Sequence, residues 1–585
     1  MAPAALIPLV VVGPLALAAA LLAFSHYLPK HLDDIVAPLM ALAVAVLCAV
    51  LAVETARHGP IAYWFGGWTP RAGLVLGIGF GVDVASAVLG AFVALLFATT
   101  FVFAWGFFDE VHGHFQVLML LFLAAMEGFC LTRDLFNLFV WFEVMSVAAF
   151  ALTAYQLETP SLAGALNFTV TNSLASFMML GGVGLVYART GLLDFGALSH
   201  ALARHPLDPV VAGAFCLLAA ALMIKAAIVP FHFWLSDAHA VAPTPVSVIF
   251  SGAMVSVGLF ALAKLGLGPF FASKDAHFLL HDWFTALGCV TAVVGGIMAW
   301  SQRHLKRMLA FSTIAHLGIM LLGIASISSL GLAGFLVYFV GHGLVKAALF
   351  MVAGILLAMR ASVDEINLKG LGRGIWPAGI GMGLGGILLG GAPFGALDRG
   401  TQLVQASAWQ TGGFVASAAI VIGTVLTGAA VLRAAGRIFL DLDPDPGEEA
   451  NSPTQDEREK ANRPLWLMLA PCVLLLLVAC VPAEKVDSVL AQAAFMMAPQ
   501  LGNAAAPLAA NTSHTIEWLC VALTVALAVL KLYHTRIPRP LVATTGRLID
   551  PPLKALKKLH SGLIPDYVVW ITVGFAAFAA VLVVP

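Results

Sequence analysis

The stretch VAGAFCLLAAALMIKAAIVPFHFW (211–234) decides the fold class. It is long and apolar enough to form a helix that crosses a bilayer, which takes about 20 apolar residues. Lys225 lies inside it, and Pro230 follows five residues later. The proline removes a backbone donor and breaks or kinks the helix, so the freed carbonyls must face water or protein. A lysine beside a broken spanning helix is the arrangement that places a charge at a hydrated midplane site.

The whole chain has the same apolar character. Of its 585 residues, 61% are hydrophobic and 10% are charged, against about 25% charged residues in an ordinary soluble protein. This leaves too little polar surface to cover a globule in water, which excludes soluble enzymes and nucleic-acid-binding proteins. The net charge of −1 gives no long-range attraction to an acidic partner. The seven cysteines lie in apolar runs without CxxC spacing, which indicates core residues.

About sixteen apolar runs are long enough to span a membrane. Their continuity indicates helices, since barrel strands alternate in polarity. We therefore predict an all-α polytopic membrane protein, with spans that begin near residues 4, 34, 84, 115, 134, 164, 208, 243, 279, 306, 331, 376, 411, 464, 514 and 565. The first run lacks the basic lead and cleavage site of a signal peptide, so we expect it to be retained. The Gly-rich segment 74–86 is the exception and is predicted to form a surface hairpin.

Composition divides the chain into four regions. Residues 1–110 hold the first spans and the hairpin, and residues 111–440 form the core. Residues 441–463 form an acidic loop that is predicted to be disordered. Residues 464–585 hold the last helices, joined by a basic linker from Tyr533 to Pro565 that we expect to lie along the membrane surface.

Cations in short loops predict the orientation. In the second half, loops after odd-numbered spans carry most of them, whereas the first half gives a weaker signal. We therefore expect both termini outside and the protein in the bacterial inner membrane. The loop cations before the acidic segment are Arg303, Lys306, Arg307, Arg360, Lys369, Arg373, Arg433 and Arg437.

Ionisable residues inside the spans are the strongest functional signal, since each costs about 2.5–3.5 kcal/mol at the bilayer centre. Glu143 and Lys225 are predicted to carry protons in the first half. The alternative is a structural pair that only locks two helices. A lysine that alternately gains and loses contact with a carboxylate can regain and release a proton.

The second half repeats this pattern. His316, His342 and Lys346 lie inside spans, and the last two share one helix face because they are four residues apart. Histidine carries protons through either ring nitrogen. Asp398 and Arg399 lie in GGAPFGALDRG (390–400), a second interrupted span.

Charge beside a broken helix in both halves is typical of inverted transporter repeats. The separation between Glu143 and Lys225 along the chain equals that between His316 and Asp398. This equality has little weight, because the proline follows the charge in one half and precedes it in the other.

Weaker candidates are Glu127, His232, Asp237, His239 and Lys264. Glu127 either feeds Glu143 or seals a helix contact, and Lys264 is expected to reach the interface from its helix end. His232, Asp237 and His239, which follow Pro230, form either an exit for protons through a loop or only a turn. Asp83, Arg133 and Asp134 lie at span ends and are expected to cap or anchor helices. No phosphate loop, metal-ligand cluster or G-x-S-x-G motif is present, so we expect no cofactor, no metal and no catalytic site.

Three runs identify a resemblance: CLTRDLFNLFVWFEVMS (130–146), IKAAIVPFHFWLSDAHAVAPTPVSVIFSG (224–252) and LKRMLAFSTIAHLGIM (305–320). They resemble the proton-translocating antiporter-like subunits of Mrp Na+/H+ antiporters, respiratory complex I and membrane-bound hydrogenases. The resemblance covers roughly residues 70–440. The segment DLFNLFVWFEV (134–144) is most similar to the D subunit of Mrp antiporters.

The resemblance implies ten core helices in two inverted five-helix repeats, with the seventh and twelfth spans broken. It assigns the input carboxylate to Glu143 and its partner amine to Lys225. It places His316, His342 and Lys346 on a central hydrophilic axis.

Two positions depart from the family pattern. Ser256 stands where many members have a lysine in the eighth span, with Lys264 at the helix end instead. The twelfth span offers Asp398 or Arg399 after GAPF, where the family has a Lys or Glu after G-x-P-P.

These features predict a subunit of a cation/proton antiporter, without a redox cofactor of its own. Its expected partners are other membrane subunits, lipid, and the transported ions, which are protons with or without Na+. No nucleic-acid partner is expected. A first alternative is a proton-pumping subunit of complex I or a hydrogenase-type complex. A second is a scaffold whose charges only hold helices together.

Overall fold

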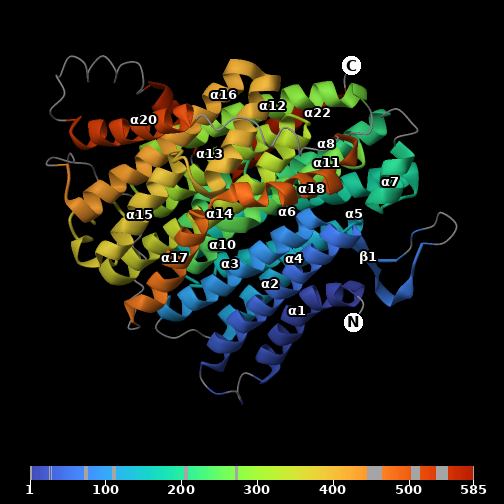
Figure 1. The fold of residues 1–585 in the computed structure, drawn as a ribbon, viewed down its shortest axis with the longest axis horizontal. Coiled ribbons are helices and arrows are strands. Elements are labelled where there is room, and N and C mark those ends of the chain that lie inside the picture. Colours follow the sequence, from blue (N-terminus) through green and yellow to red (C-terminus); the bar gives the residue numbers. More distant parts are fainter. Residues whose placement is uncertain are drawn as a thin grey trace.

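Apolar runs form α-helices along most of the chain, because a helix satisfies its backbone donors and acceptors internally. The structure is a computed structural model (Figure 1). It describes all residues except 1–2, 25–26, 28, 30, 71–74, 76, 109–112, 203–207, 271–273, 444–463, 502–513, 535–550, 561 and 584–585. Most of the acidic loop and much of the basic linker therefore lie outside the described residues.

The first half holds long membrane helices and several short ones. Their bounds are α1 Ile7–Phe24, α2 Leu32–His58, α3 Val84–Phe107, α4 Gly113–Leu131, α5 Leu135–Thr153, α6 Thr159–Thr190, α7 Phe195–Leu202, α8 Pro209–Lys225, α9 Phe233–Val241, α10 Thr244–Ile249, the π-helix η3 Phe250–Met254, α11 Val255–Leu267 and α12 Lys274–Ser301.

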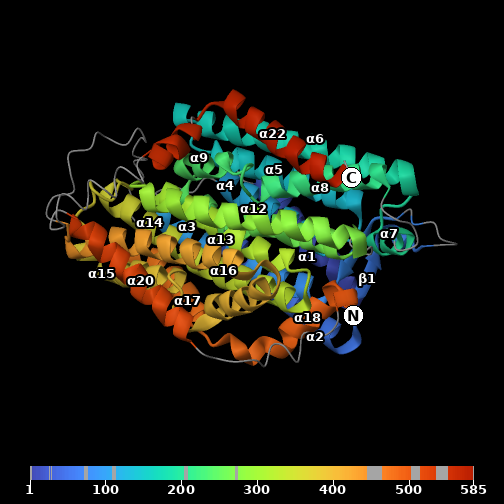
Figure 2. The same ribbon diagram turned by 90° about the horizontal axis from the view of Figure 1, so that it is seen from above.

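The second half continues the bundle. Its helices are α13 Leu305–Ala325, α14 Ser329–Arg360, α15 Trp376–Leu389, α16 Gly395–Leu440, α17 Leu465–Ala479, α18 Asp487–Met497, α20 Thr515–Leu532 and α22 Ile564–Val583. Helix α22 packs against α6 and α8 (Figure 2), so the end of the chain lies beside its first half.

Twelve helices of the described residues are long and apolar enough to cross a membrane, or thirteen if the bent pair Pro551–Leu559 and Ile564–Ala580 counts as one span. The chain is a multi-pass helical membrane protein. The predicted number of sixteen is higher because it counted three shorter helices, α8, α15 and α17, as full spans. These helices have only 14 to 17 residues.

The surface hairpin is present but begins earlier than predicted. Strand β1 (Ile61–Trp64) pairs antiparallel with β2 (Gly79–Val82), so only the second strand lies within 74–86. A Cβ on Gly79 would lie 2.8 Å from the Trp64 ring and 3.1 Å from the Arg133 side chain. Glycine therefore permits the close packing of this hairpin. Residues 74 and 76 of the predicted segment lie outside the described part.

The most buried part of the bundle runs along α10, η3 and α11, which form one span, and along α13 and α14. The span formed by α10, η3 and α11 lies wholly inside the molecule, and so does α13. As predicted, Asp83 caps α3 and Asp134 caps α5, each through a carboxylate that accepts a backbone N–H.

Helix boundaries recur at one fixed interval in the two halves. The interval from the start of α5 at Leu135 to the start of α13 at Leu305 equals that from the start of α6 at Thr159 to the start of α14 at Ser329. The ion pairs Arg133–Asp194 (2.6 Å) and Arg303–Asp364 (3.4 Å) recur at the same interval.

Candidate functional site

Lys225 is the last residue of α8 and is fully buried. Its Nζ donates a hydrogen bond to Ser146 Oγ at 2.8 Å and lies 4.8 Å from the centre of the Phe142 ring. The Ser146 hydroxyl in turn donates to the Phe142 carbonyl at 2.7 Å, which leaves its lone pairs for the lysine. The lysine is thus held by a hydroxyl and an aromatic face.

Glu143 lies one helical turn before Ser146 on α5, so the two share a face. It interacts electrostatically with Lys225. Among the described residues, no ion pair joins the two, and the half-buried Glu143 has no hydrogen-bond partner at Oε1. The structure therefore brings the predicted acid and amine together, with Ser146 as the direct contact of the lysine.

The chain leaves the helical conformation after Lys225 and resumes it at Phe233. Two freed backbone groups find side-chain partners: Trp234 Nε1 donates to the Ile224 carbonyl at 2.9 Å, and the Val229 amide donates to Thr291 Oγ1 at 3.1 Å. This satisfies backbone that a membrane leaves without water. A second break separates α15 from α16, between Leu389 and Gly395.

Gly395 shows why that second break needs a glycine. Its φ is +87°, and a Cβ would lie 2.1 Å from the Ala479 carbonyl oxygen of α17. Any side chain would force α16 away from α17.

The span formed by α10 and α11 contains a π-helical turn, Phe250–Met254. Such turns are frequent at functional sites. Ser251 Oγ lies 2.6 Å from Thr313 Oγ1 of α13, so a hydroxyl contact crosses between the halves. Ser256, at the position of the family's lysine, is fully buried and its hydroxyl has no partner among the described residues.

Lys346 of α14 repeats the arrangement of Lys225. It is fully buried, and its Nζ donates to Ser312 Oγ at 2.7 Å and to the Leu309 carbonyl at 2.8 Å. His342 lies one turn earlier, and neither of its ring nitrogens has a hydrogen-bond partner in the described part of the chain. Buried polar atoms of this kind are commonly satisfied by water.

His316 continues this series. Its ring centre lies 5.2 Å from that of His342. Its Nδ1 is 2.6 Å from the Tyr338 hydroxyl, and its Nε2 is 3.1 Å from Thr427 Oγ1 of α16. The structure thus brings together His316, His342 and Lys346, as predicted.

Lys306 was missed as a site residue. It was predicted to be a loop cation, but it is fully buried and its Nζ donates to the Ala242 carbonyl at 2.8 Å. His239 is also fully buried and stacks on Phe350 at 4.7 Å. It interacts electrostatically with two buried amines, those of Lys306 and Lys346. The FHFWLSDAH run was a signal for His239, but no sequence signal marks Lys306.

Asp398 and Arg399 have different surroundings at the start of α16. Asp398 is 5% exposed; its Oδ2 accepts a hydrogen bond from Gln402 at 3.0 Å, and its Oδ1 has no partner among the described residues. The Arg399 guanidinium binds both carboxylate oxygens of Asp487 on α18, at 3.1 and 2.5 Å. Arg399 therefore anchors α18, and Asp398 is the residue available to a proton.

The weaker candidates are held by local contacts. Glu127 is buried, with Oε2 3.6 Å from Cys48 Sγ. Lys264 is partly exposed, and its Nζ donates to the carbonyls of Cys130 (3.3 Å) and Thr132 (3.0 Å) at the end of α4. These contacts follow from the carbonyls that a helix C-terminus leaves free.

His232 and Asp237 contact the C-terminal segment. His232 Nε2 lies 3.0 Å from His560 Nε2. Asp237 accepts a hydrogen bond from the Tyr567 hydroxyl at 2.8 Å and faces Arg307 at 3.7 Å. They thus hold the C-terminal segment: His232 contacts the residue His560 before α22, and Asp237 contacts Tyr567 of α22.

Arg433 and Arg437 were predicted in a loop, but both are buried in α16. They share Glu365 as an ion-pair partner, at 3.1 and 2.5 Å. Within the described residues, no group of three or more His, Cys, Asp or Glu is arranged to hold a metal.

Comparison with known proteins gives the family. Residues 132–427 match the model described as NADH:quinone oxidoreductase/Mrp antiporter, TM, which is half of the chain. The chain is 37% identical over 324 residues to NADH-quinone oxidoreductase subunit N of Desulforudis audaxviator, covering 54% of this chain and 62% of that relative. It is 28% identical over 410 residues to the putative antiporter subunit mnhD2 of Staphylococcus aureus, covering 69% and 80%.

Solved structures have the same fold. A chain of the Mrp complex from Dietzia aligns with a TM-score of 0.72 at 25% identity, over 89% of this chain and all of that one. Respiratory complex I from Thermus thermophilus gives a TM-score of 0.69 at 23% identity, over 85% of this chain and all of that one. From the matched residues and the fold, the chain belongs to the NADH:quinone oxidoreductase/Mrp antiporter transmembrane family.

Proposed function

We propose that this chain is the D-type, proton-translocating subunit of a multisubunit Mrp-type cation/proton antiporter. The observation that carries this proposal is a pair of fully buried lysines, Lys225 and Lys346, each held by a serine hydroxyl. Burying an amine without a carboxylate in contact is costly in a membrane, and residues that carry this cost commonly mark proton and ion pathways. The likeness to the antiporter subunit mnhD2 and to the Mrp complex supports the antiporter assignment.

The proposed path begins near Glu143, passes through Lys225 and crosses at Ser251 and Thr313. It continues through Lys346 and on to Asp398 by way of His342 and His316. Water bridges the gaps, since His342 and Ser256 present buried polar atoms without protein partners in the described residues. The partners are other membrane subunits, protons, Na+ and lipid.

We also propose that the core consists of two inverted five-helix repeats between residues 111 and 440. The shared interval from α5 to α13 and from α6 to α14 supports this division. Each interval holds four of the long spans and the short helix α8. We infer that α8 and α9 together make a fifth, broken crossing, and an odd number of crossings inverts the second unit in the membrane. From the loop cations we further propose that both termini face outward from the bacterial inner membrane, and that residues 464–585 form a C-terminal set of helices.

A second candidate function is proton pumping within an NADH:quinone oxidoreductase. It is favoured by the 37% identity to subunit N of Desulforudis audaxviator. Purification of the native complex decides between the two: small antiporter subunits support the first, and iron–sulfur or nickel–iron subunits support the second.

The transport assignment is tested with Lys225→Ala in the whole complex, reconstituted into vesicles. We expect proton flux to be lost while the complex still assembles. Lys558→Ala is the matched control, because it removes the same side chain from an exposed position. Unchanged flux in an assembled Lys225→Ala complex would leave only a scaffold role.

A further inference from the structure

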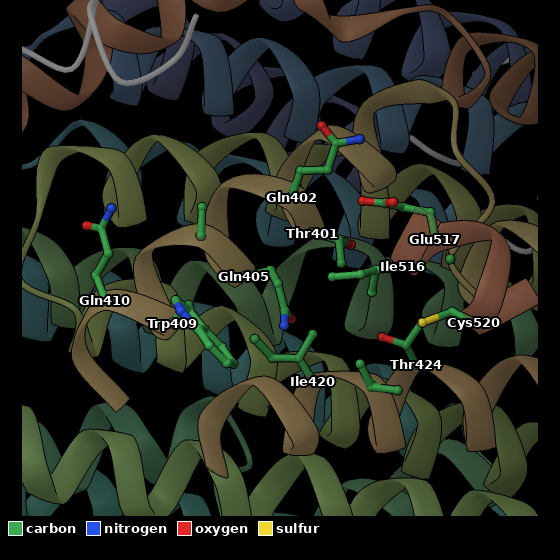
Figure 3. Close-up of a pocket in the computed structure, with 13 residues that line it drawn as sticks. Thr401, Gln402, Gln405, Trp409, Gln410, Ile420, Thr424, Ile516, Glu517 and Cys520 are labelled. Atoms are coloured by element: carbon green, nitrogen blue, oxygen red, sulfur yellow. The ribbon is translucent and has the colours of Figure 1, made fainter. Parts of the chain in front are cut away.

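A pocket of about 400 Å³ lies between α16 and the C-terminal helix α20. Figure 3 shows Glu517 and Cys520 of α20 facing residues of α16, with the Glu517 carboxylate pointing toward Thr401 and Gln402. Thr424, from beyond the kink of α16 at Gly413, also lines the pocket. The core of the family match ends at residue 427, so α20 lies outside it.

The buried polar series reaches this pocket through Tyr338. The Tyr338 hydroxyl lies 2.6 Å from His316 Nδ1, and its side chain also interacts with that of Thr401, which lines the pocket. Asp398 reaches the same wall through Gln402, whose amide donates to the carboxylate at 3.0 Å.

Two unpaired polar atoms belong to residues that line the pocket, and a third belongs to Asp398, which binds the lining residue Gln402. In the described part of the chain, Asp398 Oδ1, Glu517 Oε2 and Thr424 Oγ1 are buried without a hydrogen-bond partner. Thr424 is only 3% exposed and Asp398 only 5%. The wall of the cavity is mostly apolar, but a cavity of this size with unsatisfied polar groups on its wall has the room and the partners for ordered water. Asp398 and Glu517 also interact electrostatically, so one carboxyl group lies in the pocket wall and the other lies behind Gln402 of that wall.

We propose that this pocket is a hydrated exit chamber and that Glu517 accepts the proton that Asp398 releases. The Asp398 carboxylic acid gives its proton to chamber water and becomes a carboxylate. The Glu517 carboxylate takes up a proton from that water and later releases it to the bulk. The inference rests on the proposed proton-translocating function and adds an acceptor from a helix outside the matched core.

The first test is Glu517→Gln in the assembled complex in vesicles. We expect proton flux to fall about tenfold or more, since a positioned acid or base contributes a factor of this size, and Glu517→Asp to restore part of it. Glu484→Gln is the matched control, because Glu484 is exposed and interacts with Asp398 but does not line the pocket. Equal losses in the two Gln variants, or no loss in Glu517→Gln, overturn the proposal.

Lys225→Ala in the same assay separates the two proposals. If Lys225→Ala abolishes flux and Glu517→Gln does not, only the exit chamber fails. If Lys225→Ala leaves flux unchanged, the proposed function itself fails.

The second test uses Cys520, which lines the pocket. In a variant whose other six cysteines are replaced by serine or alanine, a small cationic methanethiosulfonate reagent reacts only with a thiol that water reaches. We expect Cys520 to be modified in the complex and flux to be blocked. A chamber filled with lipid leaves Cys520 unreactive to this reagent, and that result overturns the hydrated chamber.

Discussion

Ser146 gives the clearest prediction at the scale of single residues. It is the hydrogen-bond acceptor of Lys225 in the described structure. A hydrogen bond to a charged group contributes about 1.5–3 kcal/mol, which corresponds to a factor of about ten or more. We expect Ser146→Ala to lower proton flux by about that factor, measured in vesicles.

Ser146→Thr keeps the hydroxyl and serves as the control for this change. We expect it to retain most of the flux. If both variants transport alike, the hydroxyl does not hold the lysine in its working position.

The site residues that could be predicted from the sequence are those deep inside spans. Lys225, His316 and Lys346 were identifiable because polarity in an apolar run has a high cost. Lys306 was not, because it is the second residue of α13, where a cation normally faces water. Its burial depends on the segment after α9, whose Ala242 carbonyl it contacts, and no local pattern encodes that packing.

At the scale of elements, the helix cap of α8 controls the helix that carries Lys225. Asp208 accepts the Val211 amide at 2.9 Å and also binds Arg189. The Val211 amide and then the Arg189 guanidinium hold the pKa of Asp208 below its usual value. A lowered carboxyl pKa stabilises the fold above the unfolded pKa, and the stabilisation is lost as the pH falls through the folded value.

We expect Asp208→Ala to destabilise the protein by about 1 kcal/mol near neutral pH, as loss of a cap does. Asp208→Asn keeps the cap and loses only the exposed ion pair, so it should cost less. Thermal unfolding of the detergent-solubilised complex measures both. The difference between Asp208→Ala and the parent should shrink below about pH 4; a constant difference contradicts the assignment.

Span positions were predictable from apolar length, but span completeness was not. The predicted starts near 208, 376 and 464 coincide with α8, α15 and α17, which are shorter than a full span. Broken and shortened helices satisfy their free backbone through tertiary contacts such as Val229 with Thr291. The hairpin shows the same limit, because its first strand lies upstream of the glycines that signalled it.

For the whole molecule, the interval between matching helix starts refines the comparison of the two halves. The equal separations along the sequence pair Glu143 with His316 and Lys225 with Asp398. The separation along the chain within each of these pairs is longer than the separation between the starts of α5 and α13 by nearly one helical turn. With the helix interval, His316 corresponds to Ser146, the contact of Lys225. Positions one turn apart share a helix face, so both intervals keep the same face.

The largest stability effect is expected at the charge network that joins α16 to the segment before α15. Glu365 is 1% exposed and pairs with both Arg433 and Arg437. Removing one member of a buried ion pair costs about 3–5 kcal/mol, because it leaves an uncompensated charge. Glu365→Gln should therefore lower the unfolding temperature strongly or prevent assembly.

The exposed pair Arg373–Asp441 is the matched control for this prediction, with side chains 63% and 39% exposed. Exposed pairs contribute about 0–1 kcal/mol, so Asp441→Asn should leave the unfolding temperature nearly unchanged. If both variants unfold together with the parent, water reaches the network around Glu365 and screens its charges. If both fall equally, burial of the network around Glu365 is not the cause of the loss of stability.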